Sequence, residues 1–356
     1  MRPRLVEVEG TNYGMGLQYG KKLGKAIRES LAANYAITEF YTGLSREQCV
    51  KNVGRFTDHL ELNVPHLCEE MRGIAEGSKI SYEDVLALNF HARDLPGGCT
   101  MIYIDGSAAE EGRALTGQTV DWTPMLRPYY HLLRMLPDKG PEMLQFTQAG
   151  VIGLIGRNSV GVNVFMNILL TSERIPTGLP AYLLLRLALE QTSLEDALTV
   201  LKEKKRASPF NYLISEDGEG ACNVEGTPRR FVKDMVTKKF YVHTNHCLDP
   251  TLKKVDLYVQ IARSDETLRR YSRMNRLLNG LNGRQQKKKT SILNAFRLLS
   301  DHENFPDSIC RHGRSELEER ARFATLGAVM SREGDEGLWV IYGNPCDERP
   351  SFYPLS

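Results

Sequence analysis

Gly97-Gly98-Cys99-Thr100 is the segment of this 356-residue chain whose residue types and order best support covalent chemistry. It follows Pro96, where a helical texture ends and the first β-type segment begins. A cysteine that opens a strand can attack the carbonyl carbon of the residue before it. Glycine at position 98 has no Cβ to hinder the attack and accepts strained backbone. An N→S acyl shift and hydrolysis would then divide the chain and make Cys99 a new N-terminus. A small buried core cysteine is the alternative interpretation.

The cleavage would also supply a base. A free α-amine has a reference pKa of about 7.7–8.0, so near neutral pH it can accept the proton of the adjacent thiol. Nucleophile and base then belong to one residue, as in enzymes with an N-terminal threonine. This arrangement would explain why the sequence shows no obvious cysteine–histidine pair.

Other catalytic and ligand-binding motifs are weak. His243-Thr244-Asn245-His246-Cys247 gathers metal-ligand types, but residues 243 and 246 of a strand point to opposite faces, and no second cluster has zinc spacing. The chain has no G-x-S-x-G motif. The glycines within residues 14–20 lie in a helix-like stretch, which argues against a dinucleotide or phosphate loop. We therefore predict no metal and no organic cofactor.

The elements that must position Cys99 fall into two parts. Residues 1–98 read as a short strand at Leu5–Val8 followed by helices, whereas short β-type segments dominate after that point. The expected helices include an apolar face at Ile27–Phe40 and the spans Pro65–Ala75, Tyr82–His91, Ala181–Gln191, Ser193–Lys202, Asp265–Leu278 and Ser291–Ser300. The expected strands are Cys99–Ile104, Ala114–Asp121, Met143–Gln148, Gly150–Ile155, Val160–Asn167, Asn211–Ser215, Gly220–Glu225, Phe231–Val236, Phe240–Thr244, Phe323–Met330 and Gly337–Tyr342. Helices early and late around strands favour stacked sheets covered by helices over an alternating βαβ series.

Composition and charge exclude several classes of protein. Hydrophobic residues make up 41% of the chain and charged residues 25%, as in ordinary soluble proteins. Because the net charge is only +2, the chain as a whole has no strong positive electrostatic potential that would attract nucleic acid or an anionic membrane. The basic run Arg284–Lys289 is interpreted as a solvated loop. Seven scattered cysteines and an N-terminus without the apolar core of a signal peptide favour reduced thiols and a cytoplasmic location.

Short motifs along most of the chain, in matching order, resemble the acyl-coenzyme A:6-aminopenicillanic acid acyltransferase (isopenicillin N acyltransferase) family of self-processing N-terminal-nucleophile hydrolases. Each motif is modest, but their common order is specific. The motifs are Gly10-Thr11 with Gly16 and Gly20, Gly98-Cys99-Thr100, Gly117-Gln118-Thr119-Val120-Asp121-Trp122, Gln148-Ala149-Gly150-Val151-Ile152-Gly153, Gly156-x-Asn158-x-x-Gly161, Pro176-Thr177-Gly178, His243–Cys247, Asp301–Pro306, Ser308–Arg311, Arg322–Leu326 and Gly343-Asn344-Pro345.

The resemblance implies an α+β fold, a four-layer αββα sandwich, made as a precursor that is cut between Gly98 and Cys99. Residues 1–98 would become an α chain and residues 99–356 a β chain, both remaining in one αββα unit. Cys99 would be the nucleophile, Asp121 would orient the freed amine and Asn245 would donate to the oxyanion. Arg322 would be the basic residue of the substrate pocket.

Each of these residues also has a structural interpretation. Asp121 could cap the turn that follows it, Asn245 could be satisfied by neighbouring backbone, and Arg322 could be solvated. Two positions depart from the fungal enzymes of the family: Gly97 stands where they carry an acid, and Ala321 where they have a serine. Gly97 predicts that processing is slower or differently assisted. Ala321 puts the penicillin chemistry in doubt more than the thiol mechanism.

The sequence thus predicts an autoproteolytically activated cysteine acyltransferase or amidohydrolase. Its partners would be a small-molecule acyl donor, either an amide or an acyl-CoA thioester, and an amine or water acceptor. The α and β chains of the same precursor would stay associated, and neither nucleic acid nor membrane would bind. From a different class, the chain could be an unprocessed, inactive family member that serves as a binding or scaffold protein.

Overall fold

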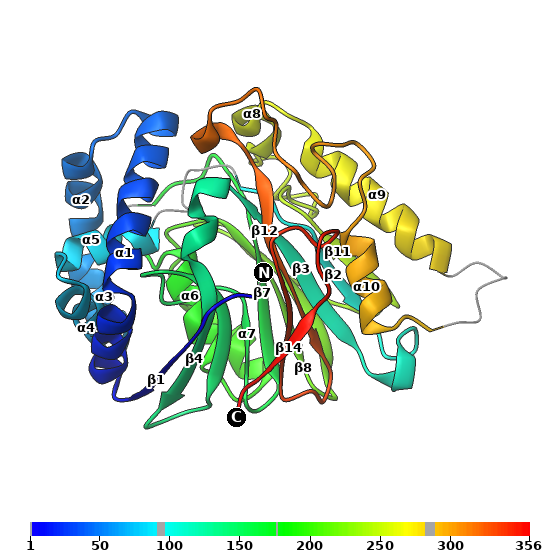
Figure 1. Ribbon diagram of the computed structural model, residues 1–356, viewed down its shortest axis with the longest axis horizontal. Coiled ribbons are helices and arrows are strands. Elements are labelled where there is room, and N and C mark those ends of the chain that lie inside the picture. The colour runs from blue at the N-terminus through cyan, green and yellow to red at the C-terminus, as the bar shows by residue number, and fades with distance from the viewer. Residues whose placement is uncertain (1, 91–96, 176, 282–288) are drawn as a thin grey trace.

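Two β-sheets packed face to face form the centre of the computed structural model, which describes residues 2–90, 97–175, 177–281 and 289–356 (Figure 1). The larger sheet has eight strands, and only its outer pair β1–β4 is parallel. Its order is β1 (Leu5–Gly10), β4 (Tyr130–Pro137), β5 (Met143–Gln148), β6 (Gly156–Asn158), β7 (Val162–Ile168), β8 (Phe210–Glu216), β9 (Gly220–Gly226) and β10 (Phe231–Met235).

The smaller sheet has six strands and is antiparallel throughout. Its order is β11 (Phe240–His243), β2 (Met101–Ile104), β3 (Leu115–Trp122), β12 (Ala324–Arg332), β13 (Gly337–Tyr342) and β14 (Ser351–Pro354). Every residue of β2, β3, β5 and β7 is buried, because these strands pack on the opposite sheet and under helices.

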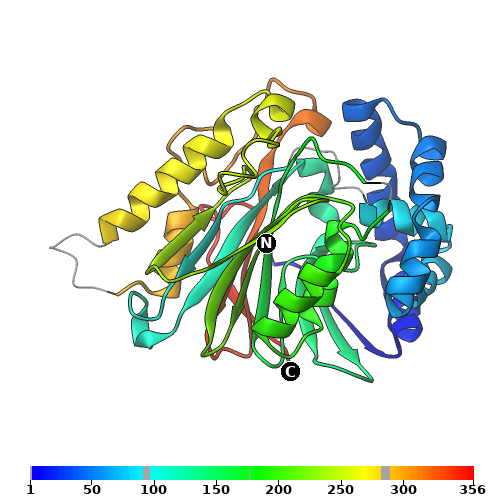
Figure 2. The ribbon, with the colours of Figure 1, turned by 180° about the vertical axis from the view of Figure 1, so that it is seen from behind.

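Helices cover the outer faces of both sheets. Helices α6 and α7 pack on the eight-stranded sheet and α1 on its β1 edge, whereas α9 and α10 pack on the six-stranded sheet (Figures 1 and 2). The predicted α+β class and αββα layering are thereby confirmed. The helices are α1 (Asn12–Thr42), α2 (Arg46–Gly54), α3 (Thr57–Asn63), α4 (Pro65–Ser78), α5 (Tyr82–Phe90), α6 (Ala181–Leu189), α7 (Leu194–Glu203), α8 (Tyr258–Ala262), α9 (Glu266–Leu281) and α10 (Ile292–Leu299).

Glycines allow α1 and α4 to pack with their backbones in contact. A Cβ on Gly16 would lie 2.0 Å from the carbonyl oxygen of Glu70, and a Cβ on Gly77 would lie 2.5 Å from that of Leu17. Gly16 therefore serves helix packing inside α1. This explains the glycines of the first motif without a phosphate or a nucleotide.

The segment Gly150–Ile155 corrects one predicted strand. It is a buried loop whose backbone groups are bound by side chains: Asn89 Nδ2 donates to Gly150 O at 3.1 Å, and Asn89 Oδ1 accepts from Ile152 N at 3.0 Å. Because the side chain of a distant asparagine forms hydrogen bonds with backbone groups of the loop, its apolar residues are buried without the hydrogen bonds of a β-sheet. Strands β4, β6 and β14 and helices α2, α3 and α8 were not expected from the sequence.

Parts of some expected elements lie outside the described residues. These are His91 at the end of one predicted helix, Pro176, and nearly all of the basic run before Lys289. Where the structure does describe the chain, no helix has both the length and the apolar character needed to cross a membrane.

Candidate active site

Cys99 lies two residues before the first residue of β2, in a backbone segment that extends the six-stranded sheet. Gly98 and Asp121 form an antiparallel bridge, in which Gly98 N donates to Asp121 O at 3.0 Å and Asp121 N donates to Gly98 O at 2.8 Å. The segment on both sides of the predicted scissile bond is therefore held in register with β3. Asp121, at the end of β3, is brought beside Cys99 by this pairing.

The backbone N–H and C=O of Cys99, which belong to the peptides before and after it, are each bound by a side chain from a distant element. Cys99 N donates to Asn245 Oδ1 at 2.9 Å, and Arg270 Nη1 donates to Cys99 O at 2.6 Å. Asn245 follows β11, and Arg270 is on α9. Together with the Asp121 amide on Gly98 O, these contacts fix the peptide that the sequence predicts to be cut.

Lack of space explains the two glycines before Cys99. A Cβ on Gly98 would lie 2.8 Å from Arg311 Nη1 and 2.9 Å from the Asp121 Cβ, and a Cβ on Gly97 would lie 2.3 Å from the Trp122 ring. Gly98 is not among the residues with positive φ. Glycine at position 98 is therefore explained by the close approach of its neighbours and not by a left-handed backbone.

The Cys99 thiol is buried, with 7% of the residue exposed. Burial raises the pKa of the thiol to about 12, and the nearby charge of Asp121 acts in the same direction. The Asp121 amide, the Arg270 guanidinium and the Asn167 side chain oppose this rise in pKa. In the continuous chain the sulfur is therefore a protonated thiol that needs a base.

Asp121 is a fully buried carboxylate with a hydrogen-bond partner for one of its two oxygens. Its Oδ1 accepts from Thr325 Oγ1 at 2.8 Å, because Thr325 is the β12 residue paired with it across the sheet. Its Oδ2 has no hydrogen-bond partner among the described residues. Burial raises the pKa of Asp121, while Arg270 and Arg311 oppose the rise.

Asn245 is oriented by contacts on both ends of its amide. Its Oδ1 accepts from Cys99 N and from Arg270 Nη2, each at 2.9 Å, and its Nδ2 donates to Ile168 O at 3.1 Å. Both groups that face Oδ1 are donors, so the amide cannot be reversed without losing them. In the continuous chain, Asn245 therefore presents an acceptor to Cys99, whereas the sequence predicted a donor to the oxyanion.

The hydrogen bonds of Arg322 are with its own loop, and its role in the substrate pocket stays a prediction. Its Nε donates to Leu317 O at 2.6 Å and its Nη2 to Ser315 O at 2.8 Å, both in the preceding loop.

Arg270 and Arg311 provide buried positive charge at this site. Arg270 pairs with Glu266 at 2.6 Å, and Arg311 pairs with Asp307 at 3.0 Å and lies 3.6 Å from Glu266. Two arginines thus face Glu266 and Asp121 in a closely balanced group of charges. Arg311 was visible in the Ser308–Arg311 motif, but nothing in the sequence of α9 distinguishes Arg270 from its surface arginines.

Tyr258 and Asn167 also lie near Cys99 or its backbone, and the sequence analysis did not predict them. Tyr258 OH donates to Gly97 O and lies 2.8 Å from Glu266 Oε1. Asn167 Oδ1 accepts from Asn211 Nδ2 at 3.3 Å and lies 3.0 Å from His243 Nδ1. The Asn167 Nδ2 group is buried and finds no acceptor in the part of the chain that is described. An unpaired amide donor near a thiol is suited to binding a developing oxyanion.

A surface pocket of roughly 660 Å³ opens beside this group. Tyr258, Glu266 and Arg311 line it from the β-rich part, and Phe40 and Tyr41 line it from α1. Both predicted chains therefore contribute to the pocket, which offers aromatic surface next to buried charge.

The structure thus shows an αββα sandwich with a buried thiol beside Asp121 and Asn245. The sequence profile of the acyl-coenzyme A:6-aminopenicillanic acid acyl-transferase family matches residues 108–347, and the chain belongs to that family. The prediction of an enzyme of the acyltransferase and amide-hydrolase type is confirmed by this membership. The match includes Asp121 and Asn245 and begins after Cys99.

The chain is also similar to individual proteins. The chain is 27% identical over 358 residues to the acyl-coenzyme A:6-aminopenicillanic-acid-acyltransferase 40 kDa form of Emericella nidulans, covering 98% of this chain and 94% of the relative. It is 23% identical over 250 residues to the β-alanyl-dopamine/carcinine hydrolase of Drosophila melanogaster, covering 62% and 63% of the two chains. A penicillin V acylase structure from Agrobacterium tumefaciens has 12% identity and a TM-score of 0.45, covering 71% of this chain and 84% of that chain.

Proposed function

We propose that the chain cuts itself between Gly98 and Cys99 and then transfers or hydrolyses acyl groups through a thioester on Cys99 Sγ. The observation that carries the proposal is the set of contacts around the Gly98–Cys99 peptide bond: Asp121 N donates to Gly98 O and Asn245 Oδ1 accepts from Cys99 N, while Arg270 holds Cys99 O of the next peptide. A structural core cysteine does not require its peptide to be held by buried side chains from two other elements.

In the cleavage step, the Cys99 sulfur adds to the Gly98 carbonyl carbon and its proton passes to the departing Cys99 nitrogen. The Asp121 N–H, 2.8 Å from Gly98 O, would stabilise the negative charge that develops on that oxygen. Water then hydrolyses the thioester, which leaves a carboxylate on Gly98 and a free amine on Cys99. The predicted α and β chains would remain in one unit.

In the mature enzyme, the new amine would keep Asn245 Oδ1 as its acceptor and would take the proton of the neighbouring thiol. Asp121 lies beside it with a free Oδ2, which supports the predicted orienting role. The thiolate would attack an acyl donor, and the unpaired Asn167 Nδ2 is the donor best placed for the oxyanion. An amine or water would then release the acyl group.

The acyl donor is proposed to be an amide or an acyl-CoA thioester. One relative is named as an acyltransferase of acyl-coenzyme A and another as a hydrolase, which supports both kinds of acceptor. The cytoplasmic location and the absence of nucleic-acid and membrane partners stay predictions from the sequence.

Gel electrophoresis of the purified full chain tests the cleavage. Wild type should give two bands of 98 and 258 residues, the larger beginning Cys99-Thr100-Met101, and Cys99→Ala should give one. Cys49→Ala, which changes a partly exposed cysteine far along the sequence, should be cut like wild type. Intact wild type would contradict the proposal.

Intact-mass analysis after incubation with a panel of acyl-CoA thioesters and amides tests the acyl transfer. The expected result is an acyl adduct on residue 99 of the β chain. Cleavage with neither adduct nor turnover would favour the scaffold alternative.

A further inference from the structure

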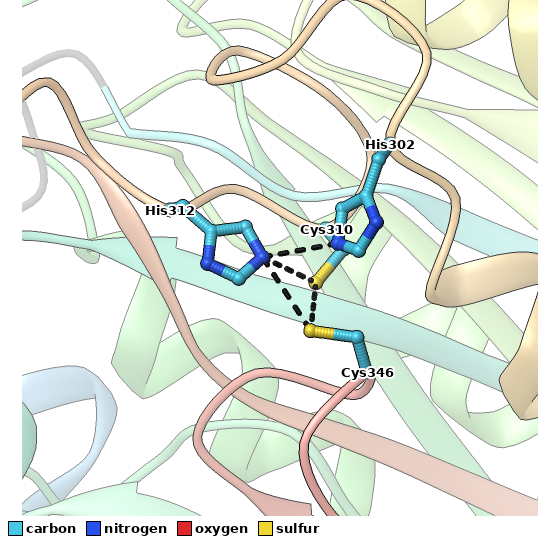
Figure 3. Close-up of side chains that lie close together, drawn as sticks. All are labelled: His302, Cys310, His312 and Cys346. Atoms are coloured by element: carbon cyan, nitrogen blue, oxygen red, sulfur yellow. Dashed lines mark hydrogen bonds between the residues drawn. The ribbon is translucent and has the colours of Figure 1, made fainter.

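Four potential metal ligands meet on the surface loops beside the six-stranded sheet, outside the residues assigned to acyl transfer. They are His302, Cys310, His312 and Cys346, and their ligand atoms all lie within 4.8 Å of one another (Figure 3). The first three belong to the segment between α10 and β12, and Cys346 belongs to the loop after β13. In the described residues, this is the sole group of its kind.

Three of the six distances between these ligand atoms match the edges of a tetrahedral zinc site, and a fourth is slightly shorter. Zinc bonds of about 2.3 Å to sulfur and about 2.0–2.1 Å to nitrogen require ligand atoms about 3.3–3.8 Å apart. The two sulfurs are 3.6 Å apart, and His312 Nε2 lies 3.6 Å from Cys310 Sγ and 3.4 Å from Cys346 Sγ. The Nε2 atoms of His302 and His312 are 3.0 Å apart. Binding of an ion would require the exposed side chains of His302, His312 and Cys346 to adjust around the buried Cys310 sulfur.

We propose that His302, Cys310, His312 and Cys346 form a structural Zn²⁺ site. Two thiolates and two imidazoles in tetrahedral arrangement are the donor set that selects zinc. Four protein ligands fill the coordination sphere and leave no position for substrate. The ion would therefore stabilise the fold and take no part in acyl transfer.

The neighbours of the ligands support a bound ion. Asn344 Nδ2 points at Cys310 Sγ at 3.5 Å, an N–H group of the kind that stabilises a ligating thiolate, and also donates to Arg311 O at 2.6 Å. Ser300 Oγ donates to Pro345 O at 2.9 Å and joins the two loops. These contacts bring the ligands together before an ion binds. Binding would release the thiol protons of Cys310 and Cys346 to solvent.

The proposed site adjoins Arg311, which lies between two ligands in the sequence. Arg311 N donates to Thr325 Oγ1 at 2.9 Å, and Thr325 in turn donates to Asp121. Zinc would fix the loop that carries Arg311 to the Cys99 site. It does so whether or not the chain is cut before Cys99.

Metal analysis of the full-length protein tests the proposal. Protein made with added zinc and freed of loosely bound metal should hold about one Zn²⁺ per chain. Cys346→Ser and His302→Ala change exposed ligands and should fold, but should hold at least about tenfold less zinc. Cys49→Ser, outside the site, should retain the wild-type content.

Replacement of zinc by Co²⁺ gives an independent readout. Wild type should show the intense d–d absorption of tetrahedral cobalt and a thiolate-to-metal charge-transfer band, and Cys346→Ser should lose part of the latter. Zinc-free wild type that takes up no added Zn²⁺ would overturn the site. Full zinc in both ligand variants, or a Cys310–Cys346 disulfide in protein purified under reducing conditions, would overturn it as well.

Discussion

Cys99 N donates a hydrogen bond to Asn245 Oδ1 at 2.9 Å across 146 positions of sequence. The contact places an acceptor on the nitrogen that is proposed to become the amine of the mature enzyme. Since Asn245 Nδ2 is occupied by Ile168 O, the asparagine and the oxyanion donor are separate groups in the continuous chain. The roles of Asn245 and Asn167 can therefore be distinguished by the size of their effects.

Asn167→Ala should reduce kcat for acyl transfer by about 10²–10³, the typical loss when one oxyanion donor is removed. Asn245→Ala should slow self-cleavage by only about 2- to 10-fold, the equivalent of one lost hydrogen bond of about 0.5–1.5 kcal/mol. Turnover of matched, fully cut samples and the rate of band appearance measure the two effects. A larger effect of Asn245→Ala on kcat would return the oxyanion role to Asn245.

Gly98→Ala should block or strongly slow self-cleavage. The new methyl group would lie 2.8 Å from Arg311 Nη1 and 2.9 Å from the Asp121 Cβ, and such overpacking typically costs about 1–3 kcal/mol. Gly54→Ala is the control, because a Cβ there meets nothing within 4 Å. Gels and thermal melts compare the variants. Rapid cleavage of Gly98→Ala with an unchanged Tm would refute the packing argument.

Self-cleavage should accelerate with pH. The pKa of the Cys99 thiol is raised to about 12, so the thiolate fraction grows about tenfold per pH unit throughout pH 6–9. Once the chain is cut, the amine replaces this dependence with a plateau above its pKa of about 7.7–8.0. Cleavage rates of freshly refolded precursor at several pH values measure the slope. A flat profile would mean that an internal base such as Asp121 removes the proton.

Arg311→Ala should abolish most acyl transfer, whereas Arg322→Ala should leave kcat/KM within about threefold of wild type, as for surface substitutions of about 0.5 kcal/mol. The Arg311 side chain is buried between Glu266 and Asp307, while Arg322 binds carbonyl groups of its own loop. Steady-state kinetics of both variants decides between the two arginines. Equal losses would support the pocket role predicted for Arg322.

Arg186→Ala should lower the free energy of unfolding by about 3–5 kcal/mol, because it leaves the buried charge of Glu70 unpaired. The pair joins α6 to α4, at 2.9 Å, with side chains 1% and 2% exposed. Lys25→Ala, which breaks an exposed pair with Glu29, should change the stability by about 0–1 kcal/mol. Urea unfolding of the uncut Cys99→Ala background gives both values. Similar losses in the two variants would contradict this assignment.

The layers of the fold were predictable because their signals are local. Pro65 begins α4, and Ser193 caps α7 by accepting from Asp196 N at 3.1 Å, as the sequence indicates. The loop Gly150–Ile155 was mistaken for a strand because Asn89, far away in sequence, satisfies its backbone. Periodicity cannot detect that kind of compensation.

The candidate site likewise contains residues that the sequence analysis predicted and residues that it did not. Asp121 and Asn245 were found because their motifs are ordered like those of a known family, and the structure places both beside Cys99. Arg270 was missed because α9 carries several arginines, and only tertiary packing buries this one. The sequence analysis did not find the ligands of the proposed zinc site, because Cys346 lies 34 positions after His312. Two strands set that spacing, and not a metal-binding turn.

The parallel pairing of β1 with β4 has a consequence for the product of the proposed self-cleavage. β1 precedes the proposed cleavage site and β4 follows it, with Leu5 opposite Leu132 and Gly10 opposite Pro137. If the shorter polypeptide departed, β4 would become a bare edge whose free N–H and C=O groups invite pairing with other molecules. Cleavage would thus leave the α chain bound to the β chain. A preparation from which the α chain has been removed should be prone to aggregation.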